Sequence, residues 1–279
     1  MSLLWKPTFL NPAFSNLEEA LKEATHFAVG AHPDDLEILA GHGISECYQN
    51  PRQHFVGVVC TTGSGSPQAD KTMSAMELSE LRSREQQNAA KKGEYAALVG
   101  LRLESAELKG PLNRSLVEGL KDILGVMKPQ VIYTHDLADP HGTHLAVTLH
   151  LIQALRESSH RPQSFYGCEV WRSLGWLDHP HKCLLPVSRS QLISELISCH
   201  QSQLKVKSYH LATLGRMQAN ATYDNAYGKN DFDFMIAAMD LLPLLADDQL
   251  LPESYLEFLL TSFLDKSLRG LYSLGKRSV

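Results

Sequence analysis

Short apolar runs alternate with longer segments of helical periodicity over the first two thirds of the chain. We predict strands at His26–Val29, His54–Cys60, Gln130–Thr134 and Ser164–Arg172, because each run is short and rich in apolar, β-branched or aromatic residues. Alternation of strands with helices is typical of a mostly parallel sheet that is covered by helices.

The segments between these runs have the spacing of amphipathic helices. Helices are predicted at Leu36–Tyr48, Met76–Gly93, Leu116–Met127 and Leu145–Leu155, and Pro129 follows the third. Strand and helix patterns together predict an α/β fold: a Rossmann-like, mostly parallel sheet flanked by helices.

The strand pattern fades after about Ser188, and helical patterns dominate the rest of the chain. A polar, Asn- and Gly-containing stretch at Gln218–Asp231 predicts a loop. We expect one domain, residues 1–222, with residues 223–279 as its helical C-terminal extension. The helices expected in this part are Ser190–His200, Phe232–Leu245 and Ser254–Leu264.

Composition narrows the class of protein. The 279 residues are 43% hydrophobic and 20% charged, values typical of a soluble globular chain. The net charge is −5 and no block of like charge occurs, which argues against a nucleic-acid partner. No apolar run reaches the roughly 18 residues of a membrane span. Without a visible secretory signal in Met1–Asn16, and with five scattered cysteines, we predict a cytoplasmic protein.

Polar residues follow the predicted strands where ligands bind in open α/β sheets, beyond the carboxyl ends. His32, Asp34 and Asp35 follow the first strand, and His141 and His144 lie shortly after the third. A Gly- and Ser-rich loop follows the second strand. We therefore expect three strand ends to converge on one rim.

These residues suit a metal. A His-x-x-Asp pair and a His-x-x-His pair together offer two imidazoles and a carboxylate, the ligand number of a catalytic zinc site with open positions. One aspartate and one histidine would remain to act on water and substrate. As an alternative, Asp34 or Asp35 caps the next helix, which explains one aspartate but not the whole set.

The two motifs resemble those of the LmbE/PIG-L-like zinc-dependent N-deacetylases. The family's Ala-His-Pro-Asp-Asp motif, followed by an acidic residue, matches residues 31–37, and its His-x-x-His motif matches residues 141–144. Many members have Pro and Asp inside the second motif, where this chain has Gly142 and Thr143. If that aspartate orients the first histidine, Thr143 would do so more weakly.

The resemblance implies roles for five residues. His32, Asp35 and His144 would be the metal ligands, with zinc as the cofactor and ferrous iron suited to the same ligands. Asp34 would be the general base. His141, as imidazolium, would stabilise the oxyanion or protonate the leaving amine.

Two weaker matches lie outside these motifs. Arg82 and Glu85 resemble the family's Arg-x-x-Glu helix, which implies that Arg82 binds substrate; a solvated helix face is the other interpretation. Residues 200–203 resemble a downstream His-x-Ser-Gln element. Trp171 and Trp176 could stack on a sugar or belong to the core.

We therefore expect a metal-dependent hydrolase that removes the N-acetyl group from an N-acetylglucosamine-type amino sugar or conjugate, a small molecule. One alternative is a non-catalytic, metal-containing protein that binds a sugar conjugate. Another is a non-haem iron oxygenase, with His32-Pro33-Asp34 as its His-x-Asp pair. The apolar helices from Phe232 onward either cap the core or form a contact in a homo-oligomer.

Overall fold

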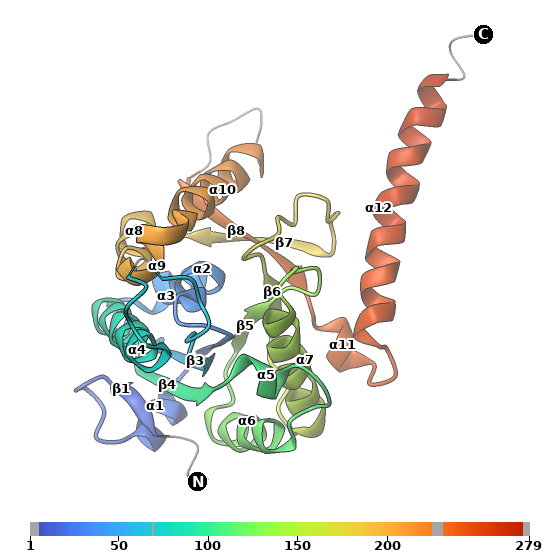
Figure 1. The fold of residues 1–279 in the computed structure, drawn as a ribbon. Helices are drawn as coiled ribbons and strands as arrows, with labels where there is room; N and C mark the ends of the chain where they lie inside the picture. The colour runs from blue at the N-terminus through green and yellow to red at the C-terminus, as the bar shows by residue number, and fades with distance from the viewer. Residues whose placement is uncertain (1–5, 69, 225–230, 276–279) are drawn as a thin grey trace.

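One eight-stranded sheet forms the centre of the computed structural model, which describes residues 6–68, 70–224 and 231–275 (Figure 1). The strand order is β1-β4-β3-β2-β5-β6-β8-β7. Strands β4, β3, β2, β5 and β6 run parallel, while β1 and the β8–β7 pair join antiparallel. The predicted α/β fold is confirmed. The strands are β1 (Pro7–Leu10), β2 (His26–Gly30), β3 (Phe55–Thr61), β4 (Ala97–Leu103), β5 (Val131–His135), β6 (Ser164–Cys168), β7 (Lys182–Val187) and β8 (Phe234–Asp240).

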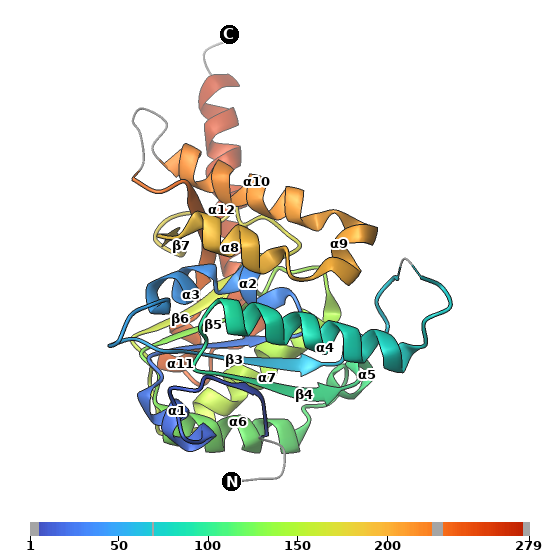
Figure 2. The same cartoon turned by 90° about the vertical axis from the view of Figure 1, so that its left-hand side faces the viewer.

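Helices cover both faces of the sheet (Figure 2). Helices α1, α6 and α7 lie on one face, and α2, α3, α4 and α8 lie on the other, with α9 and α10 beyond them. The helices are α1 (Leu17–Glu23), α2 (Asp35–Leu39), α3 (Gly41–Cys47), α4 (Ala75–Lys92), α5 (Ser105–Leu108), α6 (Arg114–Met127), α7 (Gly142–Glu157), α8 (Ser190–Ile197), α9 (Gln201–Lys207), α10 (Tyr209–Asp224), α11 (Pro243–Ala246) and α12 (Pro252–Gly275).

Two hydrophobic cores, one on each face, account for the apolar strands. Along β2, Phe27 and Val29 face the core beneath α6 and α7, while Ala28 faces the core beneath α2 and α3. A parallel strand that is buried on both faces needs an apolar residue at every position. This is why the strands appear in the sequence as continuous runs.

A reversal of strand order determines where the site lies. The chain places β2, β3 and β4 successively outward and then returns, so that β5 pairs with the other side of β2. At such a switch point the loops that leave neighbouring strands diverge and open a crevice at their carboxyl ends. The loop after β2 and the segment that leads from β5 into α7 therefore meet there.

The C-terminal part differs from the expectation. The helix predicted at Phe232–Leu245 is wrong, because Phe234–Asp240 forms β8 between β6 and β7. This run is apolar on both sides, with Met239 in one core and Ile236 in the other. Such a run has no period that separates strand from helix. The segment after residue 222, expected to be helical, thus also supplies a strand of the sheet.

Three other strands, β1, β4 and β7, had no recognised signal. Gly100 and Arg102 interrupt the apolar run of β4, and β1 and β7 lie at the two edges of the sheet. The loop predicted at Gln218–Asp231 is replaced over its first part by α10, which extends to Asp224. Residues 225–230 of that prediction lie outside the described part of the chain.

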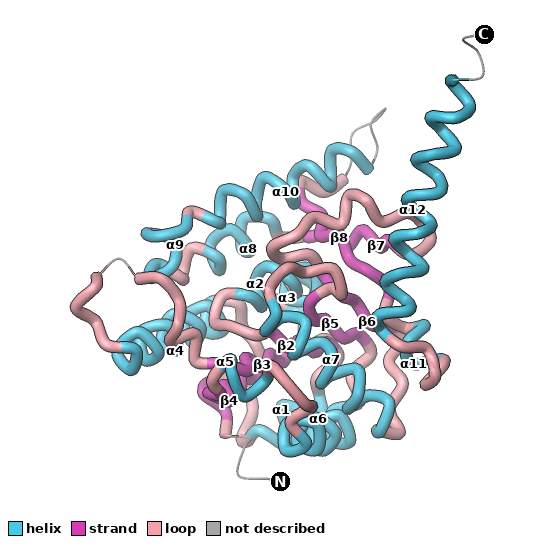
Figure 3. The backbone as a smooth tube through the Cα atoms, turned by 45° about the vertical axis from the view of Figure 1, so that its right-hand side comes forward, coloured by secondary structure: helices cyan, strands magenta, loops and turns pink. Residues whose placement is uncertain are grey.

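Helix α12 extends away from the body of the protein (Figures 1 and 3). Tyr255 and Leu259, near its start, are buried against the core, whereas Leu264 and Leu271 are exposed. Within the described ranges, none of the helices combines the length and the apolar character that crossing a membrane requires.

The packing of α3 on the sheet gives a stability prediction. A Cβ added at Gly43 would lie 2.7 Å from Cε2 of the buried Tyr133 ring. We expect Gly43→Ala to destabilise the fold by about 1–3 kcal/mol through overpacking. Gly125→Ala, in α6 and with no atom within 4 Å of the new Cβ, should instead stabilise it by about 1 kcal/mol. Urea denaturation measures both, and equal stability of Gly43→Ala and wild type would contradict this packing.

Candidate metal centre

The first motif forms a tight turn between β2 and α2. The Asp35 N–H donates to the His32 carbonyl at 3.2 Å, and Asp35 Oδ2 accepts from the His32 N–H at 2.6 Å. These reciprocal bonds close the turn around Pro33 and bring the Asp35 carboxylate to the His32 ring. Asp34, between them, has a positive φ of 107°. For a residue other than glycine this costs about 1–3 kcal/mol and needs support from the surroundings.

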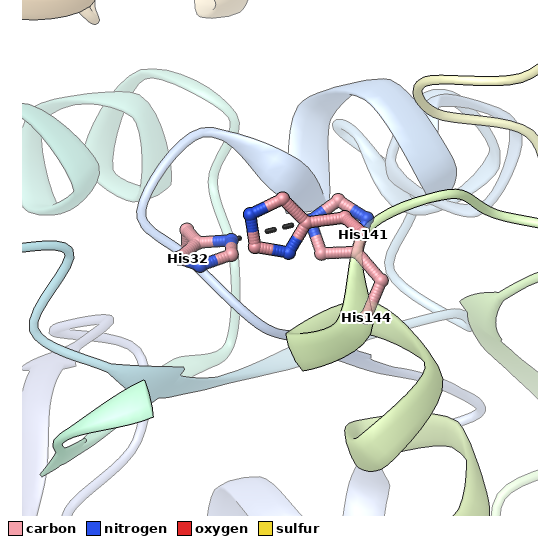
Figure 4. Close-up of side chains that lie close together, drawn as sticks. All are labelled: His32, His141 and His144. Atoms are coloured by element: carbon pink, nitrogen blue, oxygen red, sulfur yellow. Dashed lines mark hydrogen bonds between the residues drawn. The ribbon is translucent and has the colours of Figure 1, made fainter. Parts of the chain in front are cut away.

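Three atoms that could bind a metal lie close together. His32 Nδ1 lies 3.3 Å from Asp35 Oδ2 and 3.2 Å from His144 Nε2, and His144 Nε2 lies 3.5 Å from Asp35 Oδ2. In a tetrahedral zinc site with bonds of about 2.0–2.1 Å, ligand atoms are about 3.3 Å apart. The three atoms that were predicted as ligands therefore have the mutual spacing of one face of a zinc tetrahedron. Figure 4 shows the His32 and His144 rings close together, with His141 beside them.

Two more histidines adjoin this triangle, and their placement differs. Among the described residues, each forms a further grouping that could hold a metal: His141 with His32 and His144, and His135 with Asp35 and His144. His135 Nε2 accepts the Ala31 N–H at 3.0 Å, and its ring stacks on His144 at 3.8 Å. His135 is therefore occupied as a support behind His144. The centre of the His141 ring lies 4.9 Å from the centre of the His32 ring and 4.6 Å from that of the His144 ring.

A second carboxylate, which was not predicted, holds His144. Asp139 Oδ2 lies 3.2 Å from His144 Nδ1, and its Oδ1 accepts the His141 N–H at 2.8 Å. Carboxylates in this position orient metal-binding imidazoles and raise their basicity. Thr143 stands where many family members have aspartate, and its buried hydroxyl has no hydrogen-bond partner among the described residues. The sequence does offer a signal for this role of Asp139: it lies two residues before His141, in the same segment that follows a strand.

The carboxylates and imidazoles of the candidate centre favour each other's charged forms. Burial acts to raise the pKa of Asp35, but His144, His135 and His32 together hold it well below its usual range. Burial acts to lower the pKa of His144, yet Asp35 and Asp139 raise it. A cation held by these residues would meet an ionised carboxylate.

Two neighbouring carboxyl groups are pushed to opposite states. Burial, and then the charge of Asp139, raises the pKa of Asp136 to about 8, so that Asp136 is protonated at neutral pH. Burial also acts on Asp139, but hydrogen bonding and charge from His144 lower its pKa below the usual value. Of these two carboxyl groups, only Asp139 therefore adds a negative charge next to His144.

His141 is uncharged in this arrangement. Burial, followed by the charges of His144 and His32, lowers the pKa of His141 to about 4. Its Nδ1 is buried and has no hydrogen-bond partner among the described residues. The imidazolium expected from the sequence is thus not the resting form of this ring at neutral pH.

Arg82 lies behind Asp34 and is only 2% exposed. Its Nη2 donates to Asp34 Oδ1 at 3.1 Å and to the Pro33 carbonyl, and its Nη1 donates to the Gly63 carbonyl at 2.9 Å and to Ser66 Oγ. Arg82 was predicted to bind substrate, but both terminal nitrogens bond within the protein. In this structure it supports Asp34 and the loop after β3.

A buried polar network continues from Asp34 into the C-terminal half. Gln86 Oε1 accepts the Asp34 N–H at 2.9 Å, and Gln86 Nε2 donates to Glu37 at 2.8 Å. Glu37 also accepts from the Tyr95 hydroxyl at 2.6 Å and lies 3.0 Å from His200 Nε2. Burial opposes protonation of His200, but Glu37 raises its pKa, which favours a buried ion pair.

The two weaker sequence matches meet in this region. Glu85 accepts from the Ser202 N–H at 2.7 Å and from the Ser202 hydroxyl at 2.6 Å. The Arg-x-x-Glu helix and the His-x-Ser-Gln element therefore connect α4, α9 and the first motif. Their contacts hold the walls of the site together.

The network gives a second stability prediction. Gln86→Met would leave the buried Asp34 N–H without this partner, and an unsatisfied buried group costs about 1–3 kcal/mol. It would also remove one of the two hydrogen bonds to Glu37 Oε1, which keeps the Tyr95 hydroxyl. We expect a loss of about 2–4 kcal/mol in the free energy of unfolding. Gln87→Met, one residue along α4 and bonded there to Ser83, is the matched control and should change stability by under about 0.5 kcal/mol. Thermal and urea denaturation compare the two, and equal losses would contradict the role of Gln86.

Comparison with known proteins finds a family model that matches the part of the chain around the site. Residues 27–155 match the model of the PIG-L family, described as GlcNAc-PI de-N-acetylase. The resemblance inferred from the motifs is confirmed to this extent: the part of the chain that carries both motifs matches the PIG-L family model. A curated relative from Bacteroides thetaiotaomicron, a putative glucosamine-6-phosphate deaminase-like protein, is 26% identical over 152 residues. The match covers 49% of this chain and only 23% of that relative.

Solved structures share the fold. N,N'-diacetylchitobiose deacetylase from Pyrococcus horikoshii has a TM-score of 0.62 at 16% identity, covering 84% of this chain and 90% of that chain. The hydratase GalB from Pseudomonas putida KT2440 has a TM-score of 0.63 at 15% identity, covering 78% and 96%. Since a deacetylase and a hydratase match equally well, the fold does not determine the reaction.

Proposed function

We propose that this protein is a metal-dependent N-deacetylase, which releases acetate from an N-acetylated amino sugar or its conjugate. The observation that carries the proposal is the triangle of His32 Nδ1, Asp35 Oδ2 and His144 Nε2, with sides of 3.2–3.5 Å. The match of residues 27–155 to the PIG-L family model and the fold shared with a chitobiose deacetylase support it.

Zinc is the cofactor that we propose, with ferrous iron as the alternative for the same donors. His32, Asp35 and His144 would hold it, and Asp139 would orient His144. When bound, such an ion lowers the pKa of water to about 7 and polarises a carbonyl oxygen. The remaining chemistry falls to side chains of this chain.

Asp34 is the proposed general base. Its carboxylate lies beside the ligand turn and is only 8% exposed, and Arg82 holds one of its oxygens. Arg82 and Gln86 also fix the unusual backbone of Asp34, so the carboxylate enters the reaction already oriented. It would take a proton from the attacking water and return it for the leaving amine.

His141 is the proposed group at the substrate carbonyl. The neutral ring can donate a hydrogen bond to the carbonyl oxygen as negative charge develops there. Hydrogen-bond donors of this kind contribute about 3–4 kcal/mol to the stability of the transition state. His141 can also relay the proton to the leaving nitrogen.

The iron oxygenase alternative fits the geometry less well. It needs Asp34 as a ligand together with His32, but the Asp34 carboxylate pairs with Arg82 and belongs to neither metal-compatible group of described residues. A protein that only binds a conjugate would have no use for an oriented carboxylate beside the ligands. Both points favour hydrolysis.

The central functional prediction concerns acetate release. Zinc-loaded protein should release acetate from at least one N-acetylated amino sugar or conjugate, and the chelated protein should not. Asp34→Asn keeps the shape of the side chain but removes the base, so we expect kcat to fall by about 100-fold or more. Its zinc content, measured by mass spectrometry, should stay at the wild-type value.

Two outcomes would count against this assignment. Full turnover by Asp34→Asn would remove Asp34 from the base role. Equal acetate release with and without chelator would remove the metal from the reaction.

Asp139 and Asp136 provide a matched pair for the support of His144. Asp139→Asn should weaken zinc affinity about 10–100-fold, because the carboxylate no longer polarises the ring. Asp136→Asn replaces a carboxyl group that is already neutral at pH 7 and should change the affinity little. Competition with a chromophoric chelator measures both, and an equal loss in the two variants would contradict the distinction.

A further inference from the structure

An aromatic and cationic wall stands next to the candidate metal centre and has no part in the chemistry above. Its members come from three segments: Trp171 after β6, Lys207 at the end of α9 and Tyr209 at the start of α10. Lys207 Nζ lies 5.7 Å from the centre of the Trp171 ring, and the Tyr209 ring meets Trp171 edge-on at 6.2 Å.

A hydrogen bond and an ion pair connect Trp171 to the candidate metal centre. The Trp171 N–H donates to Asp139 Oδ2 at 3.2 Å, and the same oxygen lies 3.2 Å from His144 Nδ1. The Trp171 backbone is thus bonded to Asp139, the residue that contacts the proposed ligand His144, while the Trp171 side chain is 46% exposed. An indole that is fixed at its backbone and open to solvent presents a surface on which a sugar ring can stack.

Lys207 is a half-buried cation. Among residues 6–68, 70–224 and 231–275, no carboxylate oxygen lies within 4.0 Å of its Nζ. Burial, together with nearby Arg82, lowers its pKa, although Asp34 and Asp35 oppose this. A partly desolvated ammonium group gains most from an anion supplied by a ligand.

We propose that Trp171 and Lys207 form a substrate subsite that selects amino sugars carrying an anionic substituent, with the sugar ring on Trp171 and a phosphate or carboxylate on Lys207. This inference rests on the proposed function and names its substrate class. Tyr209, 7% exposed, supports the indole from the side.

Binding of compounds that lack the acetyl group tests the subsite separately from catalysis. Calorimetry on zinc-loaded protein would compare glucosamine 1-phosphate, the glycolic acid glucosaminide and the neutral methyl glucosaminide. We expect at least one of the anionic compounds to bind ten-fold or more tightly than the neutral one, and the better of the two identifies the anion. The preference should shrink as salt is raised.

Variants locate the source of that preference. Lys207→Met keeps the aliphatic packing on Trp171 and should make the three affinities equal within a factor of about two, whereas Lys205→Met, on the same helix and exposed, should preserve the preference. Trp171→Ala should weaken all three ligands by a similar factor. No preference in the wild type, no measurable binding of any compound, or a preference that survives in Lys207→Met would overturn the proposal.

Failure here is distinguishable from failure of the proposed function. Acetate release from methyl N-acetylglucosaminide needs no anion and would persist if only the subsite were wrong. Selective binding of the anionic glucosaminides would persist if only the deacetylase reaction were wrong.

Discussion

The site depends on bringing a buried carboxylate and two imidazoles within 3.5 Å of one another. Burying an isolated Asp35 charge would be costly, and the histidines around it hold its pKa well below the usual range despite that burial. The order of strands makes this possible. Because β5 returns to the free side of β2, the turn that carries His32 and Asp35 faces the start of α7, which carries His144.

A further layer of residues keeps these groups in place. Asp139 faces His144 as the ionised member of a carboxyl pair, and its neighbour Asp136, which is protonated, adds no further negative charge. On the other side, Arg82 and Gln86 support the strained backbone of Asp34. The Glu37–His200 pair connects this support to α9, so segments far apart in the sequence stabilise one turn.

Much of this arrangement could be predicted from the sequence. The strand runs indicated a parallel sheet, and the polar residues after them indicated which edge of the sheet carries the candidate site. Both features depend on local pattern and a general topological rule. The supports of the site could not be predicted in the same way. Asp139 looked like part of a loop, and the contacts of Arg82 depend on the tertiary packing of α4. Strand β8 was missed since burial on both faces leaves no periodicity.

The most direct test of the metal centre is X-ray absorption spectroscopy of the zinc-reconstituted protein. The geometry predicts nitrogen and oxygen neighbours at about 2.0–2.1 Å, with multiple scattering from two imidazole rings. His144→Ala should lose the scattering of the His144 ring. The five cysteines, free in this structure, offer a clear alternative. A sulfur shell at about 2.3 Å, or a spectrum without imidazole scattering, would contradict the assignment of His32, Asp35 and His144 as the ligands.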